Sequence, residues 1–319
     1  MALIDKDIYK AKSLLEAGEV IGIPTETVYG LAGNAFNVQA VTKIFQTKNR
    51  PTFDPLIVHS SSLAKIIQFV ETIPPLAQKL ATHFWPGPLT LLLQKKPNIP
   101  DLVTSGLETV AVRIPSHPLI LDLLELLEFP LAAPSANPFG YISPTQAEHV
   151  QAQLGNKIPY ILDGGPSHVG IESTIIGFED TTPIVYRLGG LSIEAIESVI
   201  GPVSLMPHSS SNPQAPGMLK SHYAPRKPLV LDSVDQVLKQ YVPEKIGYMG
   251  FSDFRKDLPK KNQLVLSQTR NYAEAAQKLF AAMRMLDTFP HLEIIVAELL
   301  PEEDLGRAIN DRIRRAAAR

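Results

Sequence analysis

Two cations separated by one residue stand before a stiffening proline, where the run KNRP places Lys48 and Arg50. Lysine offers a point charge and arginine a planar fork of donors, and both suit the oxygens of a phosphate group. A solvated basic turn is the more common structural explanation of such a pair. The chain then passes through the apolar run 55–59 to His59, which is either a ligand contact or a structural histidine with its hydrogen bonds satisfied.

A third cation, Arg113, stands alone in the apolar run VAVRIP. Burying a guanidinium group without an anionic partner costs free energy, so a partner is expected close by. That partner is either the carboxylate of a ligand or a structural aspartate. A fourth cation, Arg187, enters a Gly-Gly turn in the run VYRLGG.

Hydroxyl groups and small residues gather in three further runs, at 24–31 (PTETVYGL), 132–145 (AAPSANPFGYISPT) and 163–175 (DGGPSHVGIESTI). Residues of this kind at the end of a strand let a ligand approach the backbone closely. The same residue types also suit ordinary structure. For the first run the pattern favours a helix cap formed by Thr25 or Thr27, and the other two runs suit tight turns or a plain loop.

Several catalytic signatures are missing from the sequence. It contains no GxxxxGK[ST], no HExxH, no GxSxG and no cysteine, and its eight histidines show no metal-ligand spacing. What remains is a candidate cleft with Lys48, Arg50, Arg113 and Arg187, several hydroxyls and no obvious nucleophile. That combination is typical of phosphoryl or nucleotidyl transfer, in which positioning and charge carry the catalysis.

The elements that must position these residues alternate between strand and helix. In the N-terminal part, hydrophobic patterning predicts strands over 20–23, 55–59, 88–94, 110–114, 131–133, 160–162 and 173–178. It predicts helices over 40–46, 73–84, 117–127 and 145–154, after an amphipathic first helix within residues 1–20. This pattern indicates a mixed α/β domain.

The C-terminal part alternates more regularly and predicts a smaller domain with a parallel, Rossmann-like sheet. Its expected strands cover 229–231, 245–249, 264–266 and 293–297, and its expected helices 235–241, 272–286 and 306–318. It contains no GxGxxG turn, so nothing supports dinucleotide binding there. The domains are therefore predicted at 1–205 and 229–319, joined by a linker over 206–228.

The linker is predicted to be a lid. It carries five prolines and a serine run, and loops longer than about 12–15 residues are usually functional or disordered. Tyr223 and Arg226 within it are predicted to reach a nucleotide. The alternative is a passive spacer between the two domains.

The length and net charge of the chain limit the number of domains and the classes of function. The 319 residues suffice for two domains, and 30 basic against 32 acidic side chains give a net charge of −2. That balance argues against a surface that binds nucleic acid throughout, though a local basic cleft remains compatible with it. No stretch reaches the roughly 18 apolar residues of a membrane helix, and the acid-containing start does not resemble a secretory signal. We expect a cytoplasmic protein without membrane contact.

Four of these runs resemble, in order and spacing, the motifs of one family. PTETVYGL, KNRPTFDPLIVH, PLAAPSANPFGYISPT and GIESTII resemble the YrdC domain, and the part from SHYAP onward resembles the C-terminal extension of its long form. Over nearly its whole length the chain is similar to the two-domain L-threonylcarbamoyl-AMP synthases. The resemblance implies a YrdC-like domain with a twisted mixed sheet and flanking helices, followed by a smaller Rossmann-like domain.

This resemblance implies a nucleotidyltransferase that joins L-threonine, bicarbonate and ATP into L-threonylcarbamoyl-AMP and pyrophosphate. A separate tRNA threonylcarbamoyl-transfer machinery would then modify the adenosine next to the anticodon. The substrates supply the nucleophile, because the carbamate of threonine attacks the α-phosphorus of ATP. Mg²⁺ is expected with the triphosphate, bound through phosphate and water and by no protein side chain.

The resemblance also assigns site residues. Positions that match the family's threonine contacts are Thr27, His59, Arg113, Ala133 and Ser173, and those that match its ATP contacts are Lys48, Arg50, Asp54, Thr109, Ser135, Ser143 and Arg187. One departure is Asp54, which stands where many relatives have asparagine. An acid beside a triphosphate is electrostatically unfavourable, so Asp54 is expected to contact the ribose or a cation instead.

Three other functions remain as alternatives. An RNA-binding module that recognises tRNA is one, although the net charge of −2 predicts only weak direct tRNA contact. An accessory domain of the kind found in hydrogenase-maturation proteins is another, but those carry zinc-finger-like cysteines that this chain lacks. The third is a regulatory accessory protein whose small domain binds an unidentified ligand.

Overall fold

The computed structural model describes residues 1–206, 214–218 and 222–318, which form two compact units. The first unit contains Met1–Phe139 and Ser143–Leu219, and the second contains Gly140–Ile142 and Lys220–Arg319. Of the predicted linker, residues 207–213 and 219–221 lie outside the described residues. No helix in the described part of the chain is long and apolar enough to span a membrane.

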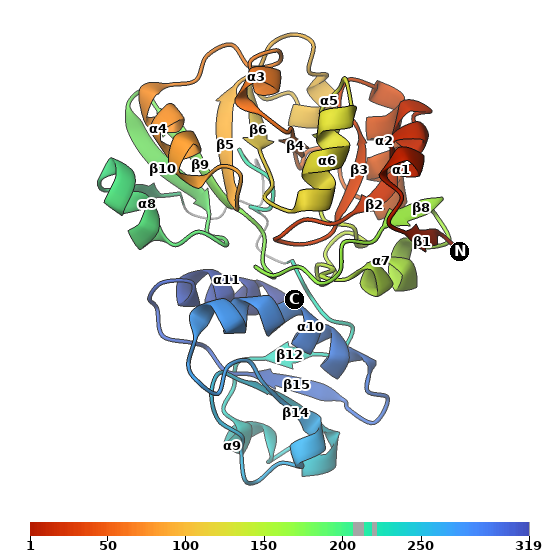
Figure 1. The fold of residues 1–319 in the computed structure, drawn as a ribbon. Helices are drawn as coiled ribbons and strands as arrows, with labels where there is room; N and C mark the ends of the chain where they lie inside the picture. Colours follow the sequence, from red (N-terminus) through yellow and green to blue (C-terminus); the bar gives the residue numbers. More distant parts are fainter. Residues whose placement is uncertain (207–213, 219–221, 319) are drawn as a thin grey trace. The chain divides into compact units, whose positions relative to one another are not determined.

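The first unit is built on one large mixed sheet (Figure 1). Parallel and antiparallel neighbours alternate irregularly across it, which confirms the expected fold class. In spatial order its strands are β1 (Leu3–Asp5), β8 (Tyr160–Leu162), β2 (Ile21–Ile23), β3 (Gly30–Asn34), β7 (Leu131–Ala132), β4 (Ile57–His59), β6 (Thr109–Arg113), β5 (Leu89–Gln94), β9 (Thr174–Glu179), β10 (Thr182–Arg187) and β11 (Ser204–Leu205).

Helices cover both faces of this sheet. On one face, α1 (Ile8–Glu16) and α6 (Pro118–Leu126) pack against β2, β7 and β8. The core on the other face includes side chains from α2 (Val38–Lys48), α4 (Pro75–Phe84), α7 (Ala147–Leu154) and α8 (Ile193–Ile200). The single-turn helix α3 (Leu63–Ile66) follows β4. A second single-turn helix, α5 (Asp101–Thr104), precedes β6.

A second cluster of side chains covers the sheet where β4, β5, β6, β9 and β10 lie side by side. Ile57 and Ala111 belong to it, and Ala215 and Met218, from the described part of the predicted linker, pack on them. Because side chains alternate along a strand, His59 shares the face of Ile57, and Arg113 shares the face of Ala111. The expected site residues of β4 and β6 therefore lie on this face of the sheet.

Local sequence explains how the first cationic motif is presented. Asn37 caps α2 by accepting from the backbone N–H groups of Gln39 and Ala40. The helix ends at Asn49, whose φ of 53° is the left-handed conformation that asparagine tolerates at a C-terminus. Lys48 therefore lies in the last helical turn, and Arg50 follows the point where the chain leaves the helix.

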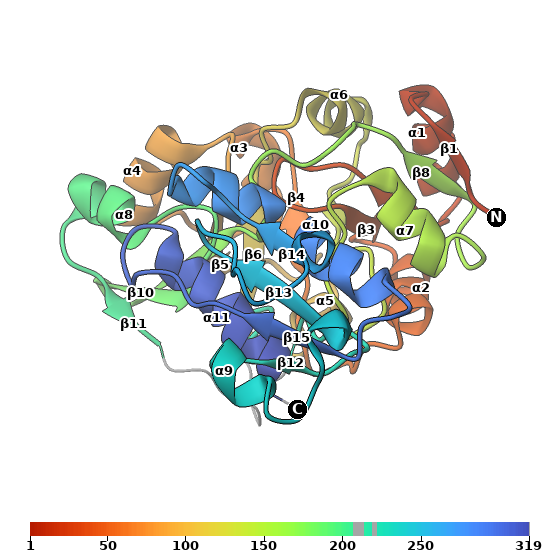
Figure 2. The ribbon, with the colours of Figure 1, turned by 90° about the horizontal axis from the view of Figure 1, so that it is seen from below.

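The second unit contains a four-stranded sheet in which all pairs are parallel, as predicted (Figures 1 and 2). Within this unit α9 packs on one face of the sheet, and α10 and α11 lie on the other (Figure 1). The strands are β12 (Leu229–Val230), β15 (Ile294–Ala297), β13 (Ile246–Gly250) and β14 (Gln263–Val265), and the helices are α9 (Val234–Val237), α10 (Tyr272–Thr288) and α11 (Gly306–Ala317), with 3₁₀ turns at Pro243–Lys245 and Lys260–Asn262.

One preferred local interpretation was wrong. Neither Thr25 nor Thr27 caps a helix, because the run that contains them leads into the strand β3 (Gly30–Asn34). The Thr25 hydroxyl instead accepts from the backbone N–H of Val28 and donates to the carbonyl of the same residue, at 3.2 and 2.6 Å. The chain turns there and β3 pairs with β2 and β7, so distant partners decide the conformation.

Candidate functional site

Among the described residues, Arg113 at the end of β6 is held by three partners. Its Nε donates to the carbonyl of Gly87 at 3.2 Å, and Nη1 donates to the Thr27 hydroxyl at 2.8 Å. Nη2 lies 2.6 Å from Oε1 of Glu26, and both side chains of this ion pair are buried. A guanidinium has five N–H groups. These three contacts therefore leave two N–H groups that can still bind a carboxylate.

His59 is the direct neighbour of Arg113 across the parallel pair β4–β6. Burial, together with the positive charge of Arg113, lowers the pKa of His59 to about 3. The imidazole is therefore neutral near pH 7. Its Nδ1 is buried and has no hydrogen-bond partner among the residues that the structure describes.

Lys48 is a buried cation held by neutral groups. Its Nζ donates to the backbone carbonyls of Ser135 and Asn137, and its side chain is almost completely buried. Burial and the nearby Arg50 lower the pKa of Lys48, while Asp54 acts in the opposite direction. In the described part of the chain no partner of Nζ is a carboxylate, so a bound anion would be the group that compensates its charge.

Arg50 and Asp54 form a second buried ion pair. Nη2 of Arg50 lies 2.9 Å from Oδ2 of Asp54, and the same guanidinium donates to the carbonyls of Asp54 and Pro55 at 3.0 and 2.8 Å. Oδ1 of Asp54 accepts from the backbone N–H of Gly217 at 3.3 Å. Asp54 is therefore compatible with a neighbouring triphosphate, since Arg50 compensates its charge.

Ser173 and Arg187 are joined directly. The Ser173 hydroxyl is 2.7 Å from that of Thr90 and accepts from Nη2 of Arg187 at 3.0 Å. Nη1 of Arg187 reaches the carbonyl of Pro216 at 3.4 Å. This network links the GIESTI run to β5, to β10 and to the described part of the predicted linker.

The loop after β7 approaches β3 closely. Ser135 forms a β-bridge with Gly30, and a Cβ on Gly30 would lie 3.2 Å from that of Ala133. A side chain at position 30 would therefore require Ala133, on the segment that also carries Ser135, to shift by a few tenths of an ångström. Further along this loop, the Ser143 hydroxyl donates to Oε1 of Glu172 at 2.6 Å.

Comparison with known proteins shows the family of this chain. A family model described as "Telomere recombination" matches residues 13–189, and one described as "Threonylcarbamoyl-AMP synthase, C-terminal domain" matches residues 191–318. The threonylcarbamoyl-AMP synthase of Pyrococcus abyssi is 39% identical over 96% of this chain and 93% of its own length. That of Bacillus subtilis is 39% identical over 98% of this chain and 93% of its own. The chain belongs to the threonylcarbamoyl-AMP synthase family.

A solved structure supports the same family assignment. The crystal structure of P. abyssi Sua5 complexed with L-threonine matches with a TM-score of 0.89 at 38% identity, and the match covers 99% of this chain and 97% of that one. The predicted function as a nucleotidyltransferase of this family is confirmed, and the binding-module and regulatory alternatives are not favoured.

In the first unit, most of the expected site residues are linked in pairs. The linked groups are Thr27 with Arg113, His59 beside Arg113, Lys48 with Ser135, Arg50 with Asp54, and Ser173 with Arg187. Thr109 is separate, because it begins β6 whereas Arg113 ends it, about 13 Å away at the usual rise of a strand. Tyr223 and Arg226 are described in the second unit, so their contact with a nucleotide stays a prediction.

Three residues of the network were not predicted as site residues. Glu26 pairs with Arg113, Glu172 accepts from Ser143, and Thr90 contacts Ser173. The sequence does contain a signal for Glu26, because a buried arginine needs an acidic partner and Glu26 is the acid of an otherwise uncharged run. Thr90 lies in the apolar strand β5, and nothing in its local sequence distinguishes it.

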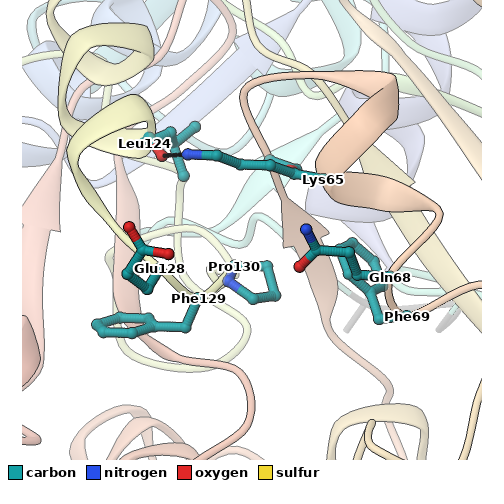
Figure 3. Close-up of a pocket in the computed structure, with 8 residues that line it drawn as sticks. Lys65, Gln68, Phe69, Leu124, Glu128, Phe129 and Pro130 are labelled. Atoms are coloured by element: carbon teal, nitrogen blue, oxygen red, sulfur yellow. Dashed lines mark hydrogen bonds between the residues drawn. The ribbon is translucent and has the colours of Figure 1, made fainter.

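A separate hollow lies beside α3 and the end of α6 (Figure 3). Nζ of Lys65 donates there to the carbonyls of Leu124, Glu125 and Leu127, at 2.8, 3.0 and 3.2 Å. These carbonyls are acceptors that the C-terminus of α6 leaves without helical partners. Because the three N–H groups of the ammonium cap the helix, we assign this hollow a structural role.

Proposed function

We propose that the chain condenses L-threonine, bicarbonate and ATP into L-threonylcarbamoyl-AMP with release of pyrophosphate. The observation that carries the proposal is the pairing of two cationic positions in one unit. Among the described residues, Arg113 keeps two N–H groups for a carboxylate, and the partners of the buried Lys48 ammonium are backbone carbonyls. An amino acid and a nucleoside triphosphate are the substrates that these two positions fit.

In the proposed reaction the amine of threonine first combines with bicarbonate to give a carbamate and water. A carbamate oxygen then attacks the α-phosphorus of ATP, and the bond from that phosphorus to the pyrophosphate oxygen breaks. Charge develops on the departing phosphates, and a fixed ammonium group such as that of Lys48 stabilises it. Arg113 holds the threonine carboxylate, so the amine is presented in a defined orientation.

His59 contributes as a neutral group. Its pKa of about 3 means that it adds no positive charge beside Arg113, and it would not repel the threonine ammonium group before the carbamate forms. The buried Nδ1 offers a hydrogen-bonding position for a polar atom of the amino acid. The relative from P. abyssi was crystallised with L-threonine, which supports threonine as the amino acid.

We propose that Mg²⁺ arrives bound to the triphosphate. No group of three or more histidine or acidic side chains that could hold a metal occurs among the described residues. Glu26 and Asp54 are paired with arginines, and Glu172 accepts from Ser143. Phosphate oxygens and water therefore suit the ion better than this chain does, and the ion would neutralise charge on the departing pyrophosphate.

The linker is proposed to cover the site during the reaction. In its described part, Gly217 donates to Asp54 and Pro216 accepts from Arg187, while Met218 packs on the sheet. These contacts join the described part of the linker to two residues expected to bind ATP. Such a cover would protect a labile carbamate and a mixed anhydride from water.

The test is an incubation of the full chain with ATP, L-threonine and bicarbonate, followed by assays for pyrophosphate and threonylcarbamoyl-AMP. Both products should form together, and omission of any one substrate should abolish both. Pyrophosphate that forms without threonine would contradict the proposal. We propose that the product passes to a tRNA-modifying transfer system in the cytoplasm, with at most weak direct contact between this chain and tRNA.

A further inference from the structure

Three residues of the loop after β7 belong to the second unit. Gly140–Ile142 are grouped with residues 220–319, whereas the residues on either side, Phe139 and Ser143, belong to the first unit. The chain therefore leaves the first unit at this loop, contributes three residues to the second, and returns. The middle residue, Tyr141, is the only one of the three with a large polar side chain.

The Tyr141 side chain is held by α10 and by the segment before β12. Its hydroxyl donates to Oδ2 of Asp287 at 2.5 Å. The guanidinium carbons of Arg284 and Arg226 lie 5.2 and 5.8 Å from the centre of its ring, within the range of cation–π attraction. Burial and the hydrogen bond to Asp287 raise the pKa of Tyr141, so the phenol keeps its proton and remains the donor.

The backbone of the same three residues is fixed as well. The carbonyl of Gly140 accepts from the backbone N–H of Ala224 at 2.8 Å, and the carbonyl of Ile142 accepts from Nη2 of Arg284. Gly140 has a φ of 79°, a conformation that L-residues rarely adopt. Each of the three consecutive residues thus has its own attachment within the second unit.

The flanking residues of this loop carry groups expected to bind the nucleotide. On the upstream side, the carbonyls of Ser135 and Asn137 hold Nζ of Lys48, and the N–H of Phe139 donates to the Lys48 carbonyl at 2.8 Å. On the downstream side, Ser143 donates to Glu172. Two residues of backbone, at most about 7 Å, separate Tyr141 from either side, so a shift of Tyr141 would move both.

We propose that Tyr141 is a positioning residue for the reaction, through which the second unit holds the nucleotide-binding loop in its productive conformation. This inference rests on the proposed function, since it assumes that Lys48 and Ser143 face the nucleotide. It assigns the second unit a role in ATP binding without requiring any ligand of its own.

The test measures binding separately from turnover in the full chain. Calorimetry with a non-hydrolysable ATP analogue should show that Tyr141→Phe raises its Kd about fivefold and Tyr141→Ala more than tenfold, because loss of the hydroxyl frees the loop and loss of the ring detaches it. The Kd for L-threonine should stay within about twofold in both variants. Steady-state assays should show the same increase in the KM for ATP.

The matched control is Tyr248→Phe. Tyr248 also donates from its hydroxyl to a carboxylate in the second unit, that of Glu298 at 3.1 Å, but lies in β13 and not in the loop. The control should lower the melting temperature about as much as Tyr141→Phe does and leave the Kd for the analogue unchanged. If Tyr141→Ala does not fold, Tyr141→Phe and Asp287→Asn carry the comparison.

Two results would overturn the inference: Tyr141 variants that bind the analogue as wild type does, or a Tyr248→Phe variant that loses as much affinity. Wild-type protein that fails to bind the analogue would overturn both this inference and the proposed function. Wild-type protein that binds the analogue yet forms no threonylcarbamoyl-AMP would contradict only the reaction, and the variant comparison would still decide the role of Tyr141.

Discussion

Removing one member of the Arg113–Glu26 pair should destabilise the first unit more than replacing both members. Both side chains are buried, and Nη2 and Oε1 are 2.6 Å apart. Deleting one partner of such a pair leaves an uncompensated buried charge, which costs about 3–5 kcal/mol. For a unit of about 200 residues, where 1 kcal/mol shifts Tm by about 2–4 °C, we expect Glu26→Gln to lower Tm by roughly 6–20 °C.

The double variant Glu26→Leu/Arg113→Met separates stability from substrate binding. Apolar side chains of similar volume can replace a buried ion pair with little loss of stability, so the double variant should melt close to wild type. Its affinity for threonine should nevertheless fall, because a charge-assisted contact to the carboxylate is worth roughly 2–5 kcal/mol when its partner is desolvated. That range corresponds to a loss of roughly 30-fold to several thousand-fold in Kd.

Urea unfolding and calorimetry with L-threonine on wild type, both single variants and the double variant complete the cycle. We expect a favourable coupling energy in unfolding, together with loss of threonine binding whenever Arg113 is absent. If the double variant bound threonine with wild-type affinity, Arg113 would be an internal ion-pair partner only, and the assignment of the carboxylate site would be refuted.

Three further predictions concern single residues. Lys48→Met should lower kcat/KM for ATP at least 100-fold while the Kd for threonine stays within about threefold, and equal loss of both would contradict its role at the phosphates. Because burial lowers the pKa of His59 from 6.5 to about 3, the unfolded state binds the extra proton between these values. Stability should therefore fall by about 2 kcal/mol from pH 7 to pH 5 through this residue, and urea titrations of His59→Gln should lack that part of the fall. Gly217→Ala should raise the KM for ATP several-fold, because φ is +77° and the new Cβ would lie 3.1 Å from Nη1 of Arg187. Gly201→Ala, with φ +83° and open space around its Cβ, is the matched control and should leave that KM unchanged.

The strands and helices that the sequence predicts correctly are those with strong local patterning. The apolar runs of β4, β5 and β6 and the parallel sheet of the second unit follow from hydrophobicity and spacing alone. The strand β3 could not be predicted in this way, because its sequence GLAGN has weak strand propensity and it forms through pairing with β2 and β7. The short helices α3 and α5 carry too few residues for a periodic signal.

In the candidate site too, local sequence predicts some residues, whereas contacts between distant parts of the chain require the fold. The sequence alone identifies Arg113 as a candidate, because it is a lone cation in an apolar strand. The need for an anionic partner follows from its burial. The identity of that partner, Glu26, depends on a contact between distant parts of the chain and requires the fold. Likewise, the sequence alone does not decide whether Lys48 belongs to a solvated basic turn. The structure shows that its side chain is buried and that the carbonyls of Ser135 and Asn137 orient it.

The most direct test of the account follows the carbon of bicarbonate. Full-length protein incubated with ¹⁴C-bicarbonate, ATP and L-threonine should transfer the label into a compound that also contains AMP and threonine. Pyrophosphate should appear in equal amount, and Arg113→Ala and Lys48→Met should abolish both signals. Pyrophosphate release without incorporation of the label, or incorporation that does not depend on threonine, would contradict the proposed reaction.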